Sequence, residues 1–408
     1  MEEQNGGVTR RGFLATAVSG LISAGLLGSP AGRLLAQETS EKTAPAKGKI
    51  ITRRLGRTKL EIPIISMGVM NADNPEVVRA SYEAGVRHFD TAGNYQYGRN
   101  EQMVGIVINK LGVRDKVTIA TKIMAPALRR GLNSTQIKEK FYSIFEGSLS
   151  RLNTDYVDIL YLHDVSSVDD VLNPASIEAM GLLREQKKVR FVGVSTHSEM
   201  AAVIDAVARS GFYDVVLTSC NFTMADDLIL LDAIKNAAAK GVGIIAMKTL
   251  AGGRRLPGSD STAEYAPGTA TAAALKWVLR NANITTAIPG YDNFEHMKED
   301  FAVAYDLEYT AEEKIFLSDN KIRLSYEFCR QCRRCLATCP HETDIPSLMR
   351  TYMYAAQYSD FHQARTTLDD ISETRGLRAC RSCTNCTARC AHDVNIPRRI
   401  EELKIIYA

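Results

Sequence analysis

The stretch that decides the fold is Arg87-His88-Phe89-Asp90-Thr91-Ala92-Gly93-Asn94-Tyr95, an apolar run that ends in polar residues. Short β-branched or apolar runs of this kind recur along the chain, and amphipathic stretches lie between them. The pattern predicts strands at Ile62–Val69, Arg87–Thr91, Val117–Lys122, Val157–His163, Val189–Ser195, Asp214–Cys220, Val242–Lys248 and Ile284–Pro289. It predicts helices at Ser134–Leu152 and Asp227–Lys240, the second ended by Gly241.

Eight strand–helix units over about 240 residues predict an α/β protein of the (β/α)8 TIM-barrel class. On periodicity alone, a doubly wound open sheet is the alternative. However, no Gly-x-Gly-x-x-Gly follows any predicted strand, so the phosphate loop of a Rossmann fold is missing. In a barrel the chemistry takes place at the C-terminal ends of the strands. The residues at these ends are therefore the candidate functional residues.

Three neighbouring strand ends carry groups suited to proton transfer: Asp90 with Tyr95 five residues later, then Lys122, then His163. Reducing a carbonyl requires a hydride on carbon and a proton on the developing alkoxide. We expect Tyr95 to be the acid, with the Lys122 cation lowering its pKa. Asp90 would hold Lys122, and His163 would orient the substrate oxygen. Tyr97 is a rival acid, but the five-residue offset from Asp90 favours Tyr95.

This set of four residues resembles the catalytic tetrad of the aldo-keto reductases. The lead-in Arg53-Arg54-Leu55-Gly56-Arg57-Thr58 and the later Gly193-Val194-Ser195 are similar to the same family. The resemblance covers roughly residues 50–305. It implies a carbonyl or alcohol substrate of small size and a nicotinamide cofactor, NADP or NAD.

The cofactor contacts that the resemblance implies depart from the usual family pattern. The candidates are Ser195, Thr196, Asn221, Met247, Lys248 and Gly290. Leu217 stands where the family has a Gln, and Met247 where an aromatic often stacks on the nicotinamide. Gly290-Tyr291 and His296 replace the residues that usually bind a 2′-phosphate, so the choice between NADP and NAD stays open. Asn221, Lys248 and the Gly252-Gly253-Arg254 loop are the candidate replacements.

Eight of the nine cysteines form two runs of identical spacing near the C-terminus. The runs are Cys329-x2-Cys332-x2-Cys335-x3-Cys339-Pro340 and Cys380-x2-Cys383-x2-Cys386-x3-Cys390. This spacing offers three thiolates to one 4Fe–4S cluster and a fourth to the partner cluster. Zinc sites use paired C-x2-C hooks, and a disulfide scaffold has no reason to repeat one spacing. We therefore predict a ferredoxin module with two 4Fe–4S clusters.

The crossed pattern assigns the ligands of each cluster. Cys329, Cys332, Cys335 and Cys390 would bind one cluster, and Cys380, Cys383, Cys386 and Cys339 would bind the other. The long spacer Ser347 to Leu377 resembles the helical two-cluster domain of succinate dehydrogenase-type subunits. The arginines of the two runs would balance cluster charge, or form a basic face for acidic partners. These arginines are Arg330, Arg333, Arg334, Arg381 and Arg389.

The N-terminus carries Thr9-Arg10-Arg11-Gly12-Phe13-Leu14-Ala15, and a modestly apolar stretch continues to Leu27. The stretch is too short and too weakly apolar for a membrane span. Two arginines followed by x-Phe-Leu resemble the twin-arginine signal, which directs folded proteins across the bacterial inner membrane. A disordered basic tail is the alternative. Because clusters are assembled in the cytoplasm, a folded-protein route to the periplasm suits this chain.

The chain of 408 residues has 50 Lys+Arg against 47 Asp+Glu, which gives no case for nucleic acid as a partner. The predicted order is signal peptide (1–36), linker (37–49), barrel (50–305), connecting segment (306–326) and a small, mainly helical 4Fe–4S domain (327–408). The predicted function is an exported oxidoreductase whose partners are a small carbonyl or alcohol, a redox protein and the twin-arginine machinery. The rival prediction is an electron-transfer or docking protein whose barrel no longer reduces carbonyls.

Overall fold

The structure is a computed structural model that describes residues 48–125, 131–252, 265–266, 268–319, 326–381 and 383–407. The chain divides into the units Met1–Ala46 and Lys47–Ala408, and everything below concerns the second. The predicted twin-arginine motif, most of the linker, and Gly253 and Arg254 lie outside the described residues. Within those ranges, the helices lack the combination of length and apolarity that crossing a bilayer would need.

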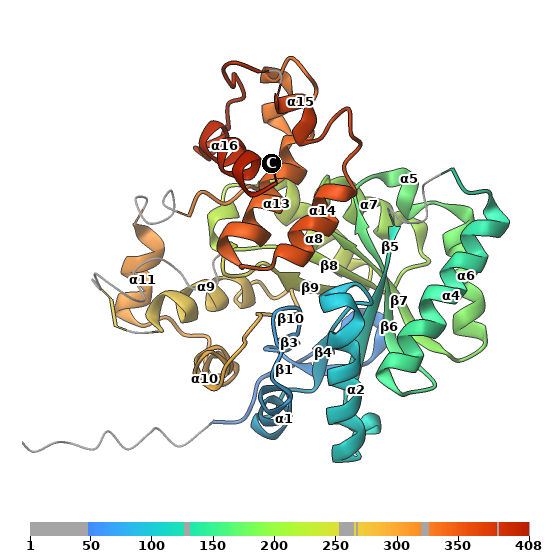
Figure 1. Cartoon of the computed structure of the whole chain (residues 1–408). Coiled ribbons are helices and arrows are strands. Elements are labelled where there is room, and N and C mark those ends of the chain that lie inside the picture. Colours follow the sequence, from blue (N-terminus) through green and yellow to red (C-terminus); the bar gives the residue numbers. More distant parts are fainter. Residues whose placement is uncertain are drawn as a thin grey trace, which may run out of the picture. The chain divides into compact units, whose positions relative to one another are not determined.

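Eight parallel strands form one sheet in sequence order, which confirms the (β/α)8 prediction. The strands are β3 (Met67–Gly68), β4 (His88–Asp90), β5 (Thr118–Met124), β6 (Val157–Val165), β7 (Val189–Thr196), β8 (Val215–Ser219), β9 (Gly243–Met247) and β10 (Thr286–Ala287). Backbone hydrogen bonds join the first strand to the last: Ser66 N donates to Ala287 O at 2.9 Å, and Gly68 N to Pro289 O at 3.0 Å. The sheet is therefore closed into a barrel (Figure 1).

The first predicted strand, Ile62–Val69, is divided in the structure. Its first half belongs to β2 (Glu61–Pro63), which pairs antiparallel with β1 (Thr52–Arg54), and only its second half contributes β3. Pro63 ends β2 because proline has no N–H to continue a ladder. Leu55 and Ile62 of this hairpin pack with inward-facing strand residues such as Ala120 and Ile245. The hairpin thus supplies side chains to the barrel interior.

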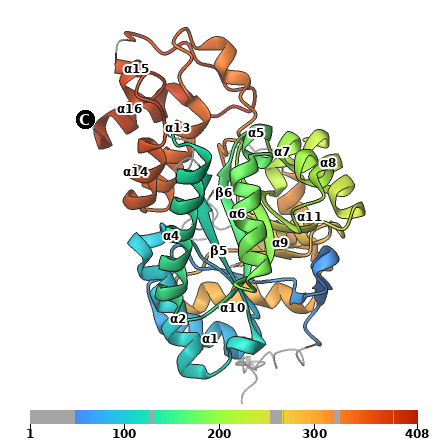
Figure 2. The same cartoon turned by 90° about the vertical axis from the view of Figure 1, so that its right-hand side faces the viewer.

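Helices follow the strands and cover the outside of the sheet, as Figure 2 shows for α4 and α6. The helices of the barrel are α1 (Pro75–Ala84), α2 (Arg99–Leu111), α4 (Ser134–Leu152), α5 (Val168–Val171), α6 (Pro174–Glu185), α7 (Met200–Ser210), α8 (Leu228–Ala239), α9 (Thr269–Leu279) and α10 (Phe294–Ala302). α4 begins at a capping box, in which Asn133 and Gln136 each bond the other's backbone N–H at 3.0 Å. The short turns are η1 (Gly56–Thr58), η2 (Tyr95–Gly98), η3 (Arg114–Lys116), η4 (Phe222–Met224) and η5 (Val303–Tyr305).

The C-terminal region, residues 326–407, is helical and has a small core of its own. After the connecting helix α11 (Ala311–Ser318), its elements are η6 (Arg334–Thr338), α13 (Ile345–Tyr352), the π-helical turn η7 (Met353–Gln357), α14 (Phe361–Asp369), α15 (Leu377–Arg381) and α16 (Ile396–Ile406). Leu348, Leu403 and Met349 are its most deeply buried side chains, and cysteines from both runs pack around this core. A helical spacer between the two runs was predicted, and it is observed.

The C-terminal region contacts the barrel at the C-terminal ends of the strands. Arg350 of α13 forms a bidentate ion pair with Asp164 of β6, at 2.8 and 2.9 Å, and both side chains are largely buried. His362 of α14 stacks on Tyr97 with ring centroids 3.5 Å apart and lies 3.0 Å from the carbonyl oxygen of Asn94. The cysteine-bearing region therefore borders the face where a barrel carries its chemistry.

Candidate active site and cysteine clusters

Neighbouring strands bring the predicted tetrad together. Asp90 is the last residue of β4, and Lys122 and His163 lie near the ends of β5 and β6. Lys122 pairs in register with Tyr161, and Met124 pairs with His163. The side chains of Lys122 and His163 therefore emerge at the same end of the barrel. Tyr95 begins the turn η2, which follows β4. The parallel strands thus bring four residues, up to 73 positions apart in the sequence, together at a single site.

The Lys122 ammonium is the centre of this site. Its Nζ donates to Asp90 Oδ1 at 2.5 Å, to the carbonyl oxygen of Thr91 at 2.7 Å and to Tyr95 Oη at 3.3 Å. The rings of Tyr95 and His163 meet edge to face, with centroids 6.0 Å apart. The rival Tyr97 is 74 % exposed and stacks on His362 instead. The geometry therefore places Tyr95, and not Tyr97, beside the lysine.

The electrostatics of the site differ from expectation in one respect. Burial, followed by the Asp90, Asp360 and Asp164 carboxylates, raises the pKa of Tyr95 well above its ordinary value. The expectation that the Lys122 cation lowers the pKa of Tyr95 was wrong, because desolvation of the phenolate outweighs the effect of the neighbouring cation. Burial also lowers the pKa of Lys122, although the Asp90 carboxylate acts to raise it. The phenol therefore keeps its proton until a substrate oxygen accepts it.

Burial, together with the nearby Lys122 cation, lowers the pKa of His163 well below its ordinary value, so its imidazole is neutral. Its Nδ1 is buried and has no hydrogen-bond partner, and the same holds for Asp90 Oδ2. A buried polar atom without a partner is costly and calls for an explanation. A substrate oxygen near His163 would satisfy one of them.

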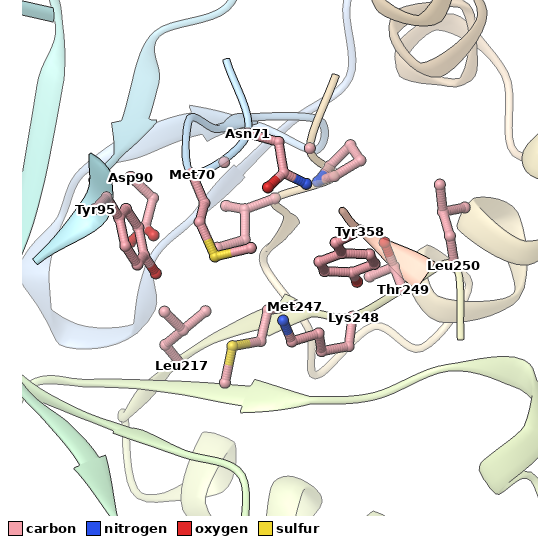
Figure 3. A pocket seen from close by; sticks show the side chains of 14 residues that line it. Met70, Asn71, Asp90, Tyr95, Leu217, Met247, Lys248, Thr249, Leu250 and Tyr358 are labelled. Carbon is pink, nitrogen blue, oxygen red and sulfur yellow. The ribbon is translucent and has the colours of Figure 1, made fainter. Parts of the chain in front are cut away.

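A cavity opens beside the tetrad (Figure 3). Its lining residues are Gly68, Met70, Asn71, Asp90, Tyr95, Leu217, Met247, Lys248, Thr249, Leu250, Ile288, Pro289, Gly290 and Tyr358. Three of the predicted cofactor contacts, Met247, Lys248 and Gly290, are among them. Leu217, Met247 and Ile288 give the cavity an apolar side near Tyr95, which suits a flat nicotinamide ring.

The other predicted cofactor contacts do not line this cavity. Ser195 Oγ accepts the backbone N–H of Asp164 at 3.1 Å, and Thr196 Oγ1 donates to the carbonyl of Val165 at 2.8 Å. Asn221 caps the turn η4 by accepting from Thr223 N at 3.1 Å and donates to the carbonyl of Lys248 at 3.1 Å. All three side chains are buried and already bonded. These hydrogen bonds hold the loops around the site in place.

The region after β10 does not suit a 2′-phosphate. Tyr291 is fully buried, and His296 Nδ1 lies 2.8 Å from Asp292 Oδ1. A carboxylate at this place repels a phosphate dianion. The residues of the cavity thus fit the ring of a nicotinamide cofactor, whereas Tyr291 and the His296–Asp292 pair do not fit the 2′-phosphate of NADP.

Tyr358 is a cavity residue that the sequence did not reveal. It follows the π-helical turn η7 of the C-terminal region, far along the chain from the tetrad, and it faces Lys248 across the cavity (Figure 3). Tyr354 of η7 accepts a hydrogen bond from Lys248 Nζ at 3.2 Å. No local motif marks either tyrosine, and only a signal of long-range contact between the two regions could have found them.

The cysteines gather into two groups of four. Cys339, Cys380, Cys383 and Cys386 line one cavity together with Pro340, Thr343 and Ile345. In the other group, burial and then the neighbouring thiols of Cys332 and Cys390 raise the pKa of Cys335 to about 11. Each group thus unites three cysteines of one run with the last cysteine of the other. The Thr387 hydroxyl donates to the carbonyl of Thr338 at 2.9 Å, which ties the two runs side by side.

The donor chemistry of these groups suits iron–sulfur clusters. All nine cysteines are free thiols, and none is paired in a disulfide. Among the described residues, no three Cys, His, Asp or Glu side chains are close enough to hold a single metal ion. A 4Fe–4S cluster needs thiolates that lie farther apart than the ligands of a single metal ion, because each thiolate binds a different iron. Cys220, the ninth cysteine, is buried near the barrel mouth, and burial raises its pKa to about 12.

The arginines of the two runs serve mostly as structural contacts. Arg330 pairs with Asp226 at 2.6 Å and Arg333 with Glu199 at 3.1 Å, and both carboxylates belong to the barrel. Arg381 and Arg389 donate to backbone carbonyls within the C-terminal region. These contacts fasten the first cysteine run to the loops before α7 and α8.

Comparisons with known proteins identify the families to which both parts of the chain are similar. Residues 67–314 match the profile of the aldo/keto reductase family, and residues 328–395 match that of a 4Fe-4S dicluster domain. L-galactose dehydrogenase of Arabidopsis thaliana is 28 % identical over 306 residues, which cover 66 % of this chain and 93 % of that protein.

Two solved structures share the fold. Aldo-keto reductase AKR11C1 from Bacillus halodurans, in its holo form, superimposes with a TM-score of 0.52 at 22 % identity, over 67 % of this chain and 96 % of that one. An aldo/keto reductase from Klebsiella pneumoniae, in complex with NADP and acetate, gives a TM-score of 0.51 at 24 % identity, over 65 % and 93 % of the two chains.

Proposed function

Since the chain belongs to the aldo/keto reductase family and carries a 4Fe-4S dicluster domain, we propose that it interconverts a small carbonyl compound and its alcohol with a nicotinamide cofactor. The observation that carries this proposal is the Lys122 ammonium, which lies 2.5 Å from Asp90 and 3.3 Å from Tyr95 Oη beside a cavity. A plant relative is an L-galactose dehydrogenase, and a bacterial structure of the same fold is a reductase in complex with NADP.

In the proposed reaction the cofactor, when bound, supplies the hydride. Tyr95 donates its phenolic proton to the carbonyl oxygen as negative charge develops there, so the product is a neutral alcohol. Lys122 stabilises the resulting phenolate, and Asp90 keeps the lysine charged and in place. His163, neutral and partly unbonded, orients the substrate oxygen.

The cofactor itself would lie against the apolar side formed by Leu217, Met247 and Ile288, with Gly290 at the rim. Asp292 beside His296 favours NAD over NADP, because its carboxylate would repel a 2′-phosphate. Mass analysis of the anaerobically purified protein for bound nucleotide would test this assignment. Retained NADP in place of NAD would contradict it.

We propose that the eight cysteines hold two 4Fe–4S clusters with the crossed ligand sets. The grouping of Cys339 with Cys380, Cys383 and Cys386 around one cavity supports this arrangement. Because a hydride carries two electrons and a cluster exchanges one, the clusters would communicate with a separate redox protein.

A second candidate function is electron transfer or docking by a barrel that no longer reduces carbonyls. It is favoured by Ser195, Thr196 and Asn221, which bond to backbone groups and do not line the cavity. It is disfavoured by the tetrad geometry. Turnover of any aldehyde or ketone by the intact protein would decide between the two candidates.

We further propose that the protein is exported to the periplasm by the twin-arginine route. The motif Thr9–Leu14 supports this, as does the need to export a cluster-bearing protein already folded. Changing both Arg10 and Arg11 to Lys should leave folded, brown precursor in the cytoplasm, as cell fractionation would show. The same fractionation of a Lys49→Arg variant serves as the control. Unchanged extracytoplasmic protein in the double variant would disprove the export proposal.

A further inference from the structure

Lys248 has an unusual backbone conformation. It directly follows β9, and its φ of 56° lies in the left-handed region that side chains other than glycine rarely adopt. Such a conformation is strained and persists only where the surroundings enforce it. Strain of this kind clusters at functional sites, so the place of the side chain is informative.

The side chain of Lys248 is held by two tyrosines of the C-terminal region. Its Nζ donates to Tyr354 Oη at 3.2 Å and lies 4.5 Å and 4.9 Å from the ring centroids of Tyr354 and Tyr358. Tyr354 belongs to the π-helical turn η7, and Tyr358 follows it; such turns inside helices often mark functional sites. The C-terminal region thus forms one wall of the cavity that Tyr95 lines (Figure 3).

The Lys248 ammonium has no carboxylate partner in the described part of the chain. The other two cations near it are paired, Lys122 with Asp90 and Arg350 with Asp164. Burial and then the Arg350 charge lower the pKa of Lys248 to about 7, so a bound anion would favour its ammonium form. The Asp360 carboxylate acts to raise the pKa of Lys248, but it caps α14 by accepting a hydrogen bond from Gln363 N at 2.9 Å. An unpaired cation in such a site is costly unless an anion joins it.

We propose that Lys248, enclosed by Tyr354 and Tyr358, binds a carboxylate of the substrate and so selects small carbonyl or hydroxy acids. The inference rests on the proposed function, since the carboxylate would anchor a molecule whose carbonyl or hydroxyl meets Tyr95. Lys248 and Tyr95 line the same cavity, so one small molecule can reach both. The C-terminal region then takes part in substrate recognition in addition to holding the cysteines.

The test is direct binding to the anaerobically prepared intact protein by calorimetry, with two matched pairs of probes: lactate with lactamide, and mandelate with mandelamide. Each amide keeps the shape of its acid and lacks the charge. The wild type should prefer the acids. Lys248→Met keeps the stem and removes the charge, so it should weaken acid binding about 10- to 100-fold and leave the amides unaffected. Lys248→Arg should keep the preference.

Lys188→Met, which removes an ammonium paired with Glu146 outside the cavity, is the matched control and should change nothing. No preference for acids in the wild type, or an unchanged preference in Lys248→Met, would overturn the inference. If Lys248→Met instead weakens NADH and NADPH and spares the acids, the ammonium serves the cofactor pyrophosphate and the inference is wrong. Because binding is measured without turnover, a protein that binds lactate but transfers no hydride would refute only the proposed function.

Discussion

Replacing Tyr95 by Phe should lower the rate of carbonyl reduction by about a hundredfold or more, the scale of general-acid catalysis. The change removes only the hydroxyl that lies 3.3 Å from Lys122 Nζ and leaves the ring against His163. Nicotinamide binding should change by no more than about twofold, because Leu217, Met247 and Ile288 remain in place. Steady-state rates with a panel of aldehydes and ketones, and fluorescence titration with NADH, would measure both effects.

Tyr97→Phe is the matched control for this prediction. Tyr97 is only two residues away, but it is 74 % exposed and stacks on His362 of the C-terminal region. Its hydroxyl has no role in the proposed reaction, so the rate should stay within about twofold of the wild type. Full activity in Tyr95→Phe combined with loss in Tyr97→Phe would transfer the acid role to Tyr97.

Replacing Cys390 by Ser should remove the cluster held by Cys329, Cys332 and Cys335, which lie in the other run. The protein should lose about half of its iron and sulfide, because the second cluster keeps all four thiolates. The reduced variant should show the EPR signal of that second cluster alone. Cys339→Ser is the reciprocal variant and should remove the cluster of Cys380, Cys383 and Cys386, whose cavity Cys339 lines.

The buried Cys220 provides the control for the iron measurements. It belongs to neither run and is buried at the end of β8, so Cys220→Ser should keep the full iron content. If Cys390→Ser and Cys339→Ser each damage the cluster of their own run, the crossed arrangement is wrong. If the wild type binds zinc and no sulfide, the cluster assignment itself fails.

The barrel could be predicted from the sequence because its signals are local. Each parallel strand is buried on both faces and reads as a short apolar run, and polar residues follow where the strand ends. Asp90, Tyr95, Lys122 and His163 were recognisable for the same reason, since the closed parallel sheet brings equivalent strand ends together. The cysteine spacing is likewise local, because three ligands of each cluster lie within seven residues.

The cofactor contacts could not be predicted as well, because they depend on side-chain direction at irregular strand ends. Ser195 and Thr196 stand at the expected place, yet Asp164, with a φ of 55°, turns its N–H toward Ser195 Oγ. The contribution of Tyr354 and Tyr358 depends on how the C-terminal region meets the barrel. Those contacts join residues more than a hundred positions apart, as with Lys248 and Tyr354, and carry no sequence motif.

The most direct test of the central claim is a single-turnover experiment with the reduced nicotinamide cofactor that carries two deuterium atoms at C4. Anaerobic wild-type protein, with its clusters intact, would be mixed with the deuterated cofactor and an aldehyde or 2-oxo acid, and the alcohol analysed by mass spectrometry. The account predicts one deuterium on the carbinol carbon, and none when Tyr95→Phe is used over the same time. Unlabelled alcohol, or oxidation of the cofactor that reduces only the clusters, would contradict it.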